Sequence, residues 1–507
     1  MNPVRNSLTG TQVQSSIMSA QTFKQISNGV KLPKEVKDIL VRLEKNKFEA
    51  VAVGGCVRDL LLGQEPKDWD IATSAQPEQI KKIFPDSFYE NKFGTVTVKT
   101  NSKKENLKEI EITTFRTEQT YSDKRHPDSI SFTSDRLDDL ARRDFTINAM
   151  ALDRTGKIFD PFDGQSDLDK KTIRTVGNAK ERFSEDALRL LRAIRFSVEL
   201  EFKIEPETFQ AIKENSELLQ MIAKERIRDE FVKMLMSQKP DQAIELLKEA
   251  GLLKHVVPEL ERGIGVPQNR HHIYTIYQHA VLSLKFATEK KYNLTIRLAA
   301  LLHDIAKPQT KRGEGLDATF YNHDYVGAKS AIRILERLKF SKKTIEQVAN
   351  LVRNHMFVYN VDEVTAAGVR RLLRRVGPEN VDDLIKLRVA DRLGSGVPKA
   401  VPYKLRHLRY LIEKVSQDPI SPKMLKINGN DLMKKLKLKP GPRLGLLIEA
   451  ILAAAIENPK INSKEKLLNK AAELDKLTDK ELKDKTKVVD EKKEEIDLEM
   501  KGKYWVK

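Results

Sequence analysis

After residue 30, short apolar runs alternate with short amphipathic stretches up to about residue 160, a pattern typical of an α+β domain. From about residue 180 onward, apolar residues recur almost throughout at helical spacing, which predicts an all-helical remainder. The predicted strands are Phe48–Val53, Trp69–Thr73, Gly94–Thr100 and Glu109–Phe115, and the predicted short helices are Val57–Leu62 and Pro77–Phe84.

Changes in this pattern predict the domain boundaries. Residues 1–30 are polar and aperiodic, so we expect a disordered leader. Residues 466–507 alternate Lys with Glu or Asp and have few apolar anchors, so we expect a solvated helix or a flexible tail. Between them we expect a head over 31–178, a helical neck over 179–240, a helical body over 241–420 and a helical tail region over 421–465.

Composition indicates the kind of partner. A chain of 507 residues suggests three or four domains, and a net charge of +18 favours a polyanion, most simply nucleic acid. The alternative is a protein that is merely rich in lysine. The single cysteine, Cys56, excludes an internal disulfide and a cysteine-based zinc site. No apolar run approaches the roughly 18 residues of a membrane span, and we find no signal-peptide core, so we expect a cytoplasmic protein without membrane partners.

The strongest chemical signal is a glycine pair followed by two aspartates. Gly54 and Gly55 allow a sharp turn whose amides, with the helix start behind them, suit phosphate oxygens. Asp68 and Asp70 are separated by one residue, so on a strand both carboxylates point to the same face. Either feature alone is usually a turn or a solvated strand end. Together they predict Mg²⁺-dependent phosphoryl or nucleotidyl transfer.

Further residues fit this chemistry. Arg143 offers fixed donors for phosphate or carboxylate, and Asp144 and Asn148 share a face if a helix starts there. Strand alternation directs Glu111 toward the aspartate pair, where it would be an accessory group, and Glu109 shares that face.

The stretch VGGCVRDLLLGQEPKDWDIATS and the later RRDFTINAMA resemble the first two signatures of the polymerase-β-type nucleotidyltransferases. The version is that of class II tRNA CCA-adding enzymes and bacterial poly(A) polymerases, and the resemblance covers roughly residues 35–460. It implies a polymerase-β-like α+β head followed by an all-α neck, an HD-type body and a helical tail. It also implies that Asp68 and Asp70 bind Mg²⁺. The implied nucleotide-binding residues of the head are Gly54, Gly55, Arg58, Arg143, Asp144 and Asn148.

The neck contains EDALRLLRAIRF, residues 185–196. On a helix, Asp186, Arg189 and Arg192 would share one face, opposite an apolar stripe; an ordinary amphipathic helix has the same pattern. The family reads the base with an EDxxR motif, which implies that Asp186 and Arg189 bind the base and Glu185 orients Arg189. Arg192 would then reach the phosphates. Residues 121–133 look like the family's flexible loop, which favours an enzyme able to add A.

The body, within about residues 270–395, holds an adjacent His303-Asp304 pair with His279 upstream and Asp391 downstream. These four residues resemble the HD phosphohydrolase superfamily and are the expected ligands of a divalent Mg, Mn or Ni ion. His323 and His355 are left open as groups for substrate phosphate or a second ion, and His271-His272 is unassigned. The resemblance implies 2′,3′-cyclic phosphodiesterase, phosphatase or 2′-nucleotidase activity, and the alternative is an inert tRNA-binding domain.

The sequence therefore predicts an enzyme that adds CCA to tRNA from CTP and ATP, with a phosphohydrolase domain. The alternatives are a poly(A) polymerase, a CC-only or A-only enzyme, and a non-catalytic RNA-binding protein. The oligomeric state stays open.

Overall fold

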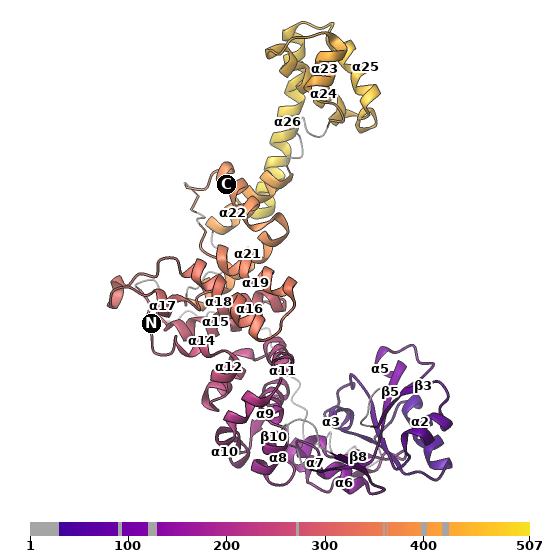
Figure 1. Cartoon of the computed structure of the whole chain (residues 1–507). Helices are drawn as coiled ribbons and strands as arrows, with labels where there is room; N and C mark the ends of the chain where they lie inside the picture. Colours follow the sequence, from indigo (N-terminus) through magenta and orange to yellow (C-terminus); the bar gives the residue numbers. More distant parts are fainter. Residues whose placement is uncertain are drawn as a thin grey trace, which may run out of the picture. The chain divides into compact units, whose positions relative to one another are not determined.

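The computed structural model of the chain describes residues 30–89, 94–119, 129–269, 273–357, 360–361, 363–396, 403–417 and 425–506. It divides into two compact units, Met1–Pro258 and Glu259–Lys507, each with buried apolar residues of its own. Figure 1 shows the elements of both units, coloured along the chain. The predicted leader, apart from Val30, lies outside the described residues, as do most of the predicted flexible loop and His271-His272.

A seven-stranded mixed sheet forms the centre of the head in the first unit. Its strand order is β3-β4-β5-β2-β1-β8-β9, and β2 and β5 are its parallel neighbours. A separate hairpin pairs β6 with β7. The strands are β1 (Ala50–Val53), β2 (Asp70–Thr73), β3 (Ser87–Tyr89), β4 (Thr95–Lys99), β5 (Glu109–Thr114), β6 (Arg116–Gln119), β7 (Ser129–Phe132), β8 (Ala151–Leu152) and β9 (Ile158–Phe159).

Hydrophobic patterning explains this sheet. All of β1 is buried, whereas β5 alternates exposed and buried residues, so Ile110 and Ile112 point into the core and Glu109 and Glu111 away from it. The four strands and two helices expected from the sequence are confirmed within two residues at each end, while β3 and β6 to β9 were not predicted. The other elements of the head are α2 (Lys34–Lys45), α3 (Gly55–Leu61), α4 (Pro77–Ile83), α5 (Glu105–Lys108), α6 (Arg136–Ala141), η2 (Thr146–Asn148) and α7 (Gly164–Asp169).

The neck follows the head within the first unit and is almost entirely helical, as predicted. Its central helix is α9, which packs against α11 and α12. Arg189, which the sequence placed on the charged face opposite the apolar stripe, is buried along with the apolar residues. The elements are β10 (Thr172–Ile173), α8 (Ala179–Glu185), α9 (Leu188–Leu200), β11 (Lys203–Ile204), α10 (Pro206–Glu214), η3 (Ser216–Met221), α11 (Lys224–Met236), α12 (Pro240–Glu249) and α13 (Leu253–Val256); α14 (Pro258–Glu261) begins at the last residue of this unit.

The second unit consists of helices in its described part. The apolar helix α16 packs against α15, α19 and α21, and α18 packs against α19. None of the described helices combines the length and apolar character needed to cross a membrane. The elements are α15 (Ile276–Glu289), α16 (Leu294–Leu302), α17 (Lys307–Thr310), η4 (Gly315–Asp317), α18 (His323–Arg337), α19 (Lys342–Asn354), α20 (Ala366–Val376), η5 (Pro378–Asn380), α21 (Val381–Gly394) and α22 (Tyr403–Gln417).

Of the two alternatives expected over residues 466–507, a solvated helix or a flexible tail, the structure shows helix, and part of it is packed. Leu467, Ala471 and Leu474 recur at helical spacing and are buried against α24, so a few apolar residues suffice to anchor the segment. Farther along, α26 contacts both α24 and α22, as Figure 1 shows. The elements are α23 (Gly429–Leu436), α24 (Pro442–Glu457), η7 (Pro459–Ile461), α25 (Lys464–Leu474) and α26 (Asp479–Tyr504).

Candidate functional site

The first candidate site lies at the turn between β1 and α3. Gly54 has a φ of 80°, a left-handed conformation that favours glycine. A Cβ at this position would lie 2.8 Å from Nη1 of Arg143 and 3.6 Å from Oδ2 of Asp70. The turn therefore brings the backbone, a guanidinium group and a carboxylate together and leaves no room for a side chain.

Asp70 is the first residue of β2, and Asp68 lies in the bend before it. The expectation that both aspartates lie on one strand is therefore wrong for Asp68. The partner strand β1 ends at Val53, opposite Asp70, because the chain turns at Gly54. Burial raises the pKa of the Asp70 carboxyl, Arg143 opposes this, and the charge of Asp68 adds to it. A cation bound between the two carboxylates would relieve their repulsion.

Glu111 lies on β5 directly beside Asp70 in the parallel register between β2 and β5. Its side chain is on the exposed face of β5, which is the alternation expected from the sequence. The carboxylates of Asp68, Asp70 and Glu111 thus lie at neighbouring positions of the head. The accessory role of Glu111 stays a prediction.

Four of the residues expected to bind nucleotide form one hydrogen-bonded chain. Arg58 Nη1 donates to Asn148 Oδ1 at 2.8 Å, and Asn148 Nδ2 donates to Asp144 Oδ1 at 3.1 Å. Arg192 Nε donates to Asp144 Oδ2 at 2.7 Å. Asp144 therefore links the head to helix α9 of the neck, because its carboxylate accepts from Asn148 in the head and from Arg192 on α9.

Sequence reasoning missed Asp139, which is buried on α6. Arg143 Nη2 donates to Asp139 Oδ2 at 3.2 Å, and Arg142 Nη2 donates to Asp139 Oδ1 at 2.8 Å. Burial alone would raise the pKa of Asp139, but the two arginines outweigh burial and lower it. The sequence contained a signal for these contacts. On a helix, an acidic residue lies on the same face as basic residues three and four positions after it.

The predicted base-reading residues lie at the junction of α8 and α9. Arg189 Nη1 donates to Glu185 Oε2 at 2.6 Å, and Arg189 also donates to the main-chain oxygens of Arg182 and Arg142, each at 3.0 Å. These three bonds use three of the five N–H donors of the guanidinium and hold it in one orientation. Glu185 thus contacts Arg189 as expected.

Asp186 lies between α8 and α9, rather than on the same helix as Arg189 and Arg192 as expected. Its Oδ1 accepts the N–H of Leu188, the first residue of α9, at 3.0 Å. Its Oδ2 accepts from Arg226 Nη2 on α11 at 3.2 Å. Arg226 was not predicted, because nothing in the local sequence marks a contact between segments so far apart.

The Asp144 contacts predict a pH-dependent contribution to stability. Burial opposes the charged carboxylate, but Arg192 and Asn148 outweigh burial and lower the pKa of Asp144 from 3.8 to about 2. A folded-state pKa below the unfolded value stabilises the fold above about pH 4, and this stabilisation is lost as pH falls toward 2. The shift corresponds to about 2 kcal/mol.

We therefore expect the unfolding free energies of the wild type and Asp144→Asn to converge by about 2 kcal/mol between pH 5 and pH 2. Urea unfolding followed by Trp69 fluorescence, in a chain carrying Trp505→Phe so that Trp69 is the remaining tryptophan, measures this in the head. The exposed Asp169→Asn controls for general acid unfolding. If the difference in unfolding free energy between the wild type and Asp144→Asn stays constant from pH 5 to pH 2, the lowered pKa assigned to Asp144 is wrong.

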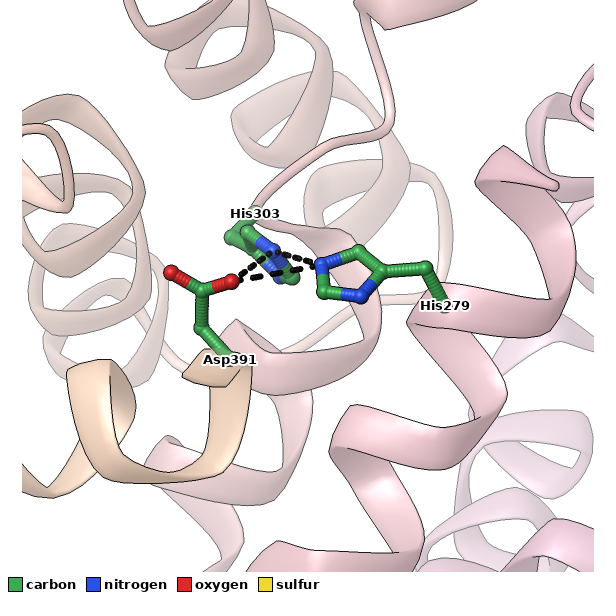
Figure 2. Close-up of side chains that lie close together, drawn as sticks. All are labelled: His279, His303 and Asp391. Atoms are coloured by element: carbon green, nitrogen blue, oxygen red, sulfur yellow. Dashed lines mark hydrogen bonds and ion pairs between the residues drawn. The ribbon is translucent and has the colours of Figure 1, made fainter. Parts of the chain in front are cut away.

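A second candidate site lies in the second unit, where His279, His303 and Asp391 point toward one another (Figure 2). His279 lies on α15, His303 follows α16, and Asp391 lies on α21. His279 Nε2 is 3.0 Å from His303 Nε2 and 3.3 Å from Asp391 Oδ1, and all three residues are buried. Three of the four predicted HD ligands thus converge from three helices.

Asp304, the fourth predicted ligand, contacts this cluster through Oδ2, which lies 3.3 Å from His303 Nε2. Its Oδ1 faces His323 and His355, at 3.4 and 3.6 Å from their Nε2 atoms. The two histidines that the sequence left open therefore form a second cluster beside the first. A cavity of about 690 Å³ opens onto these residues and is also lined by Lys307, Arg388, Arg392 and Tyr321.

The electrostatics of this site suit a cation. Burial disfavours a charged His279, but Asp304 and Asp391 outweigh burial and raise its pKa to about 9. Burial also opposes the charged carboxylates, yet neighbouring imidazoles with Lys307 and Arg388 hold the pKa values of Asp304 and Asp391 well below the usual range. Without a metal ion, the positive charge beside the two carboxylates comes from a protonated imidazole. A bound metal ion would supply that charge instead.

Comparison with known families matches three segments of the chain. Residues 50–174 match the poly A polymerase head domain, and residues 201–264 match the probable RNA and SrmB-binding site of polymerase A. Residues 318–471 match the putative tRNA nucleotidyltransferase domain 2. The fold and the site of the head thus define a nucleotidyltransferase.

Whole-chain relatives specify the family. The CCA-adding enzyme of Ligilactobacillus salivarius is 36% identical over 87% of this chain and 98% of its own, and that of Enterococcus faecalis is 35% identical over 86% and 95%. The crystal structure of the Bacillus stearothermophilus CCA-adding enzyme in complex with CTP is 29% identical, with a TM-score of 0.55 over 87% of this chain and 97% of that one. The chain belongs to the CCA-adding enzyme family of tRNA nucleotidyltransferases.

Proposed function

We propose that this enzyme adds C, C and A in turn to the 3′ end of tRNA, using CTP and ATP and no nucleic-acid template. The observation that carries the proposal is the meeting of Asp68, Asp70, Arg143 and the Gly54 turn in one site of the head. The relatives named above, and the CTP complex of one of them, support the choice of substrates.

Asp68 and Asp70 fit Mg²⁺, because two repelling carboxylates supply the hard oxygen ligands that this ion prefers. When bound, Mg²⁺ lowers the pKa of the RNA 3′-hydroxyl and neutralises charge on the leaving pyrophosphate. The new bond joins the 3′ oxygen to the α-phosphorus, and the bond from that phosphorus to the pyrophosphate breaks.

The protein groups around the aspartates would hold the triphosphate. Arg143 lies beside the Gly54 turn, with Nη1 2.8 Å from where a Cβ on Gly54 would be, so its guanidinium would attract a phosphate bound at the turn. Gly54 and Gly55 let the triphosphate approach the backbone without a side chain in the way. Asp144 and Asn148 act as positioning residues, since their contacts fix Arg58 and Arg192.

Nucleotide choice is assigned to Asp186 and Arg189. We expect Arg189→Lys to raise misincorporation of UTP and GTP at least about tenfold, because a paired base contact is worth about 1–3 kcal/mol of discrimination. Lysine keeps the charge and loses the planar fork that Glu185 orients. Single-nucleotide incorporation assays with each NTP measure this, with Arg228→Lys on α11 as the control. If Arg189→Lys lowers the free energy of unfolding but leaves nucleotide selectivity unchanged, the motif has only a structural role.

Product length on a tRNA lacking its 3′ end tests the proposal against its alternatives. Three added nucleotides, ending in A, support CCA addition. Two cytidines or a single adenosine would indicate a partial enzyme, and a long adenosine tract would indicate a poly(A) polymerase. Tight tRNA binding without any addition would indicate a binding protein.

A specific observation favours a second activity in the second unit. His279, His303, Asp304 and Asp391 form a buried cluster that could hold a metal ion, and a cavity lined by basic side chains opens onto His303, Asp304 and Asp391. We propose that this site hydrolyses phosphate esters such as 2′,3′-cyclic nucleotides. A divalent metal bound there would activate water for attack on phosphorus. Lys307 and Arg388 lie where they would attract the phosphate, and the released ribose oxygen takes up the proton.

A further inference from the structure

A strongly basic surface lies on α20, in the second unit. The sequence of this helix, AAGVRRLLRRV, contains four arginines and no acidic residue. Its larger apolar residues are buried, and the helix packs against α19 and α22. Between the buried positions lie four exposed side chains, which together are the arginine face of α20: Arg370, Arg371, Arg374 and Arg375.

The arginine face has no counter-charge. Within the described ranges, none of its four side chains makes a hydrogen bond or an ion pair. Other exposed cations of the second unit are paired, since Lys464 Nζ lies 2.7 Å from Asp431 Oδ1. Likewise, Lys470 Nζ lies 2.7 Å from Glu473 Oε2. A solvated helix face usually mixes both signs in this way, whereas the arginine face carries one sign only.

Folding of the helix does not explain this arrangement. Arg370 lies four residues before Arg374, and Arg371 four residues before Arg375, and like charges at this spacing destabilise a helix. The helix dipole favours cations in the last turn, which accounts for Arg374 and Arg375. It does not account for Arg370 and Arg371, which lie one turn earlier. The arginine face therefore fits a role in binding better than a role in folding.

The chemistry of the arginine face matches the backbone of a nucleic acid. A planar guanidinium donates parallel hydrogen bonds to two phosphate oxygens at once. From Arg370 to Arg375 the helix rises about 7.5 Å, a distance over which a nucleic-acid strand presents more than one phosphate. We propose that the arginine face of α20 binds the sugar–phosphate backbone of the tRNA and supplies part of the affinity for it. This inference rests on the proposed function, which makes tRNA the substrate.

Binding of a tRNA lacking its 3′ end to the full chain, titrated at several salt concentrations, tests the inference. With all four arginines changed to glutamine, we expect the Kd at physiological salt to rise at least about tenfold. The slope of log Kd against log salt should fall by about 3 to 4, because each lost phosphate contact lowers it by about 0.9. The matched control removes four exposed charges that lie beside acidic residues on α26 and should bind within about twofold of the wild type. Its changes are Lys480→Gln, Lys483→Gln, Lys485→Gln and Lys487→Gln.

Two further measurements separate binding from folding and from chemistry. Glutamine keeps a helix propensity close to that of arginine and removes the like-charge repulsion, so the thermal unfolding midpoint of the four-glutamine variant should not fall. In single-turnover addition, the enzyme concentration that gives half the maximal rate should rise as the Kd does. The maximal rate itself should stay within about twofold of the wild type, because the arginine face contributes affinity and not chemistry. A lower maximal rate with unchanged tRNA affinity would overturn the proposal.

Other outcomes also decide against the arginine face as a tRNA contact. An equal loss of affinity in the α26 control would show that overall charge, not this face, holds the tRNA. If the four-glutamine variant keeps its tRNA affinity but no longer binds vesicles of phosphatidylserine and phosphatidylcholine, the face binds a membrane surface instead.

The outcomes for the arginine face and for the proposed function are separable. A wild type that binds tRNA through the arginine face but adds no nucleotide keeps this inference and loses the proposed function. A four-glutamine variant that adds CCA with the wild-type affinity for tRNA keeps the proposed function and loses the inference.

Discussion

Replacing Asp70 by asparagine is expected to lower the rate of CMP and AMP addition at least about 1000-fold, equivalent to roughly 4 kcal/mol of transition-state stabilisation. Asp70 is part-buried beside Arg143 and Asp68, so the change removes one negative charge and one cation ligand while keeping the shape of the side chain. We expect Asp68→Asn to have a similar effect. Single-turnover addition to a tRNA lacking its 3′ end measures the loss.

Binding of tRNA should survive these substitutions, because affinity for a polyanion rests on many Lys and Arg contacts spread over the surface. A filter-binding titration at fixed salt provides this control. The exposed Asp86→Asn in the same head should leave both addition and binding unchanged. Near-normal addition by Asp70→Asn would refute the cation site, whatever happens to stability.

A substitution in one of the two proposed active sites is expected to leave the activity of the other site intact. His303→Ala should remove metal-dependent hydrolysis of 2′,3′-cyclic AMP, because His303 Nε2 lies within 4 Å of His279, Asp304 and Asp391 in the same cluster. Ligand number and geometry set metal affinity, so losing one ligand empties or distorts the site. CCA addition by this variant should stay within about twofold of the wild type, because the cation site proposed for addition lies in the head.

Asp70→Asn should show the reverse behaviour, with hydrolysis intact and addition lost. Both activities are measured on the same preparations of the full chain with Mg²⁺, Mn²⁺ or Ni²⁺ supplied, and His255→Ala serves as the matched histidine control. If the wild type adds CCA and hydrolyses nothing with any of these ions, the second unit has no hydrolytic role. Loss of both activities in His303→Ala, with the fold intact, would instead indicate that the sites depend on one another.

The structure corrects the sequence-based interpretation at particular residues. Asp186 was expected on one helix with Arg189 and Arg192, but it lies between two helices and binds Arg226, which belongs to α11. The tail over residues 466–507 was expected to be a solvated helix or flexible; it is helical, and Leu467 and Ala471 are buried against α24. In both places a partner far along the chain decided the outcome, and such a partner leaves no trace in the local pattern.

What the sequence determined by itself is local. The turn at Gly54, strands β1, β2, β4 and β5, and the types of residue in both sites follow from preferences that act over a few residues: backbone freedom at glycine, strand and helix periodicity, and carboxylate or imidazole chemistry. Only the tertiary structure decided which of those groups meet. Asp304 faces His279 with one oxygen and His355 with the other because separate helices pack at particular angles, and sequence spacing does not encode those angles.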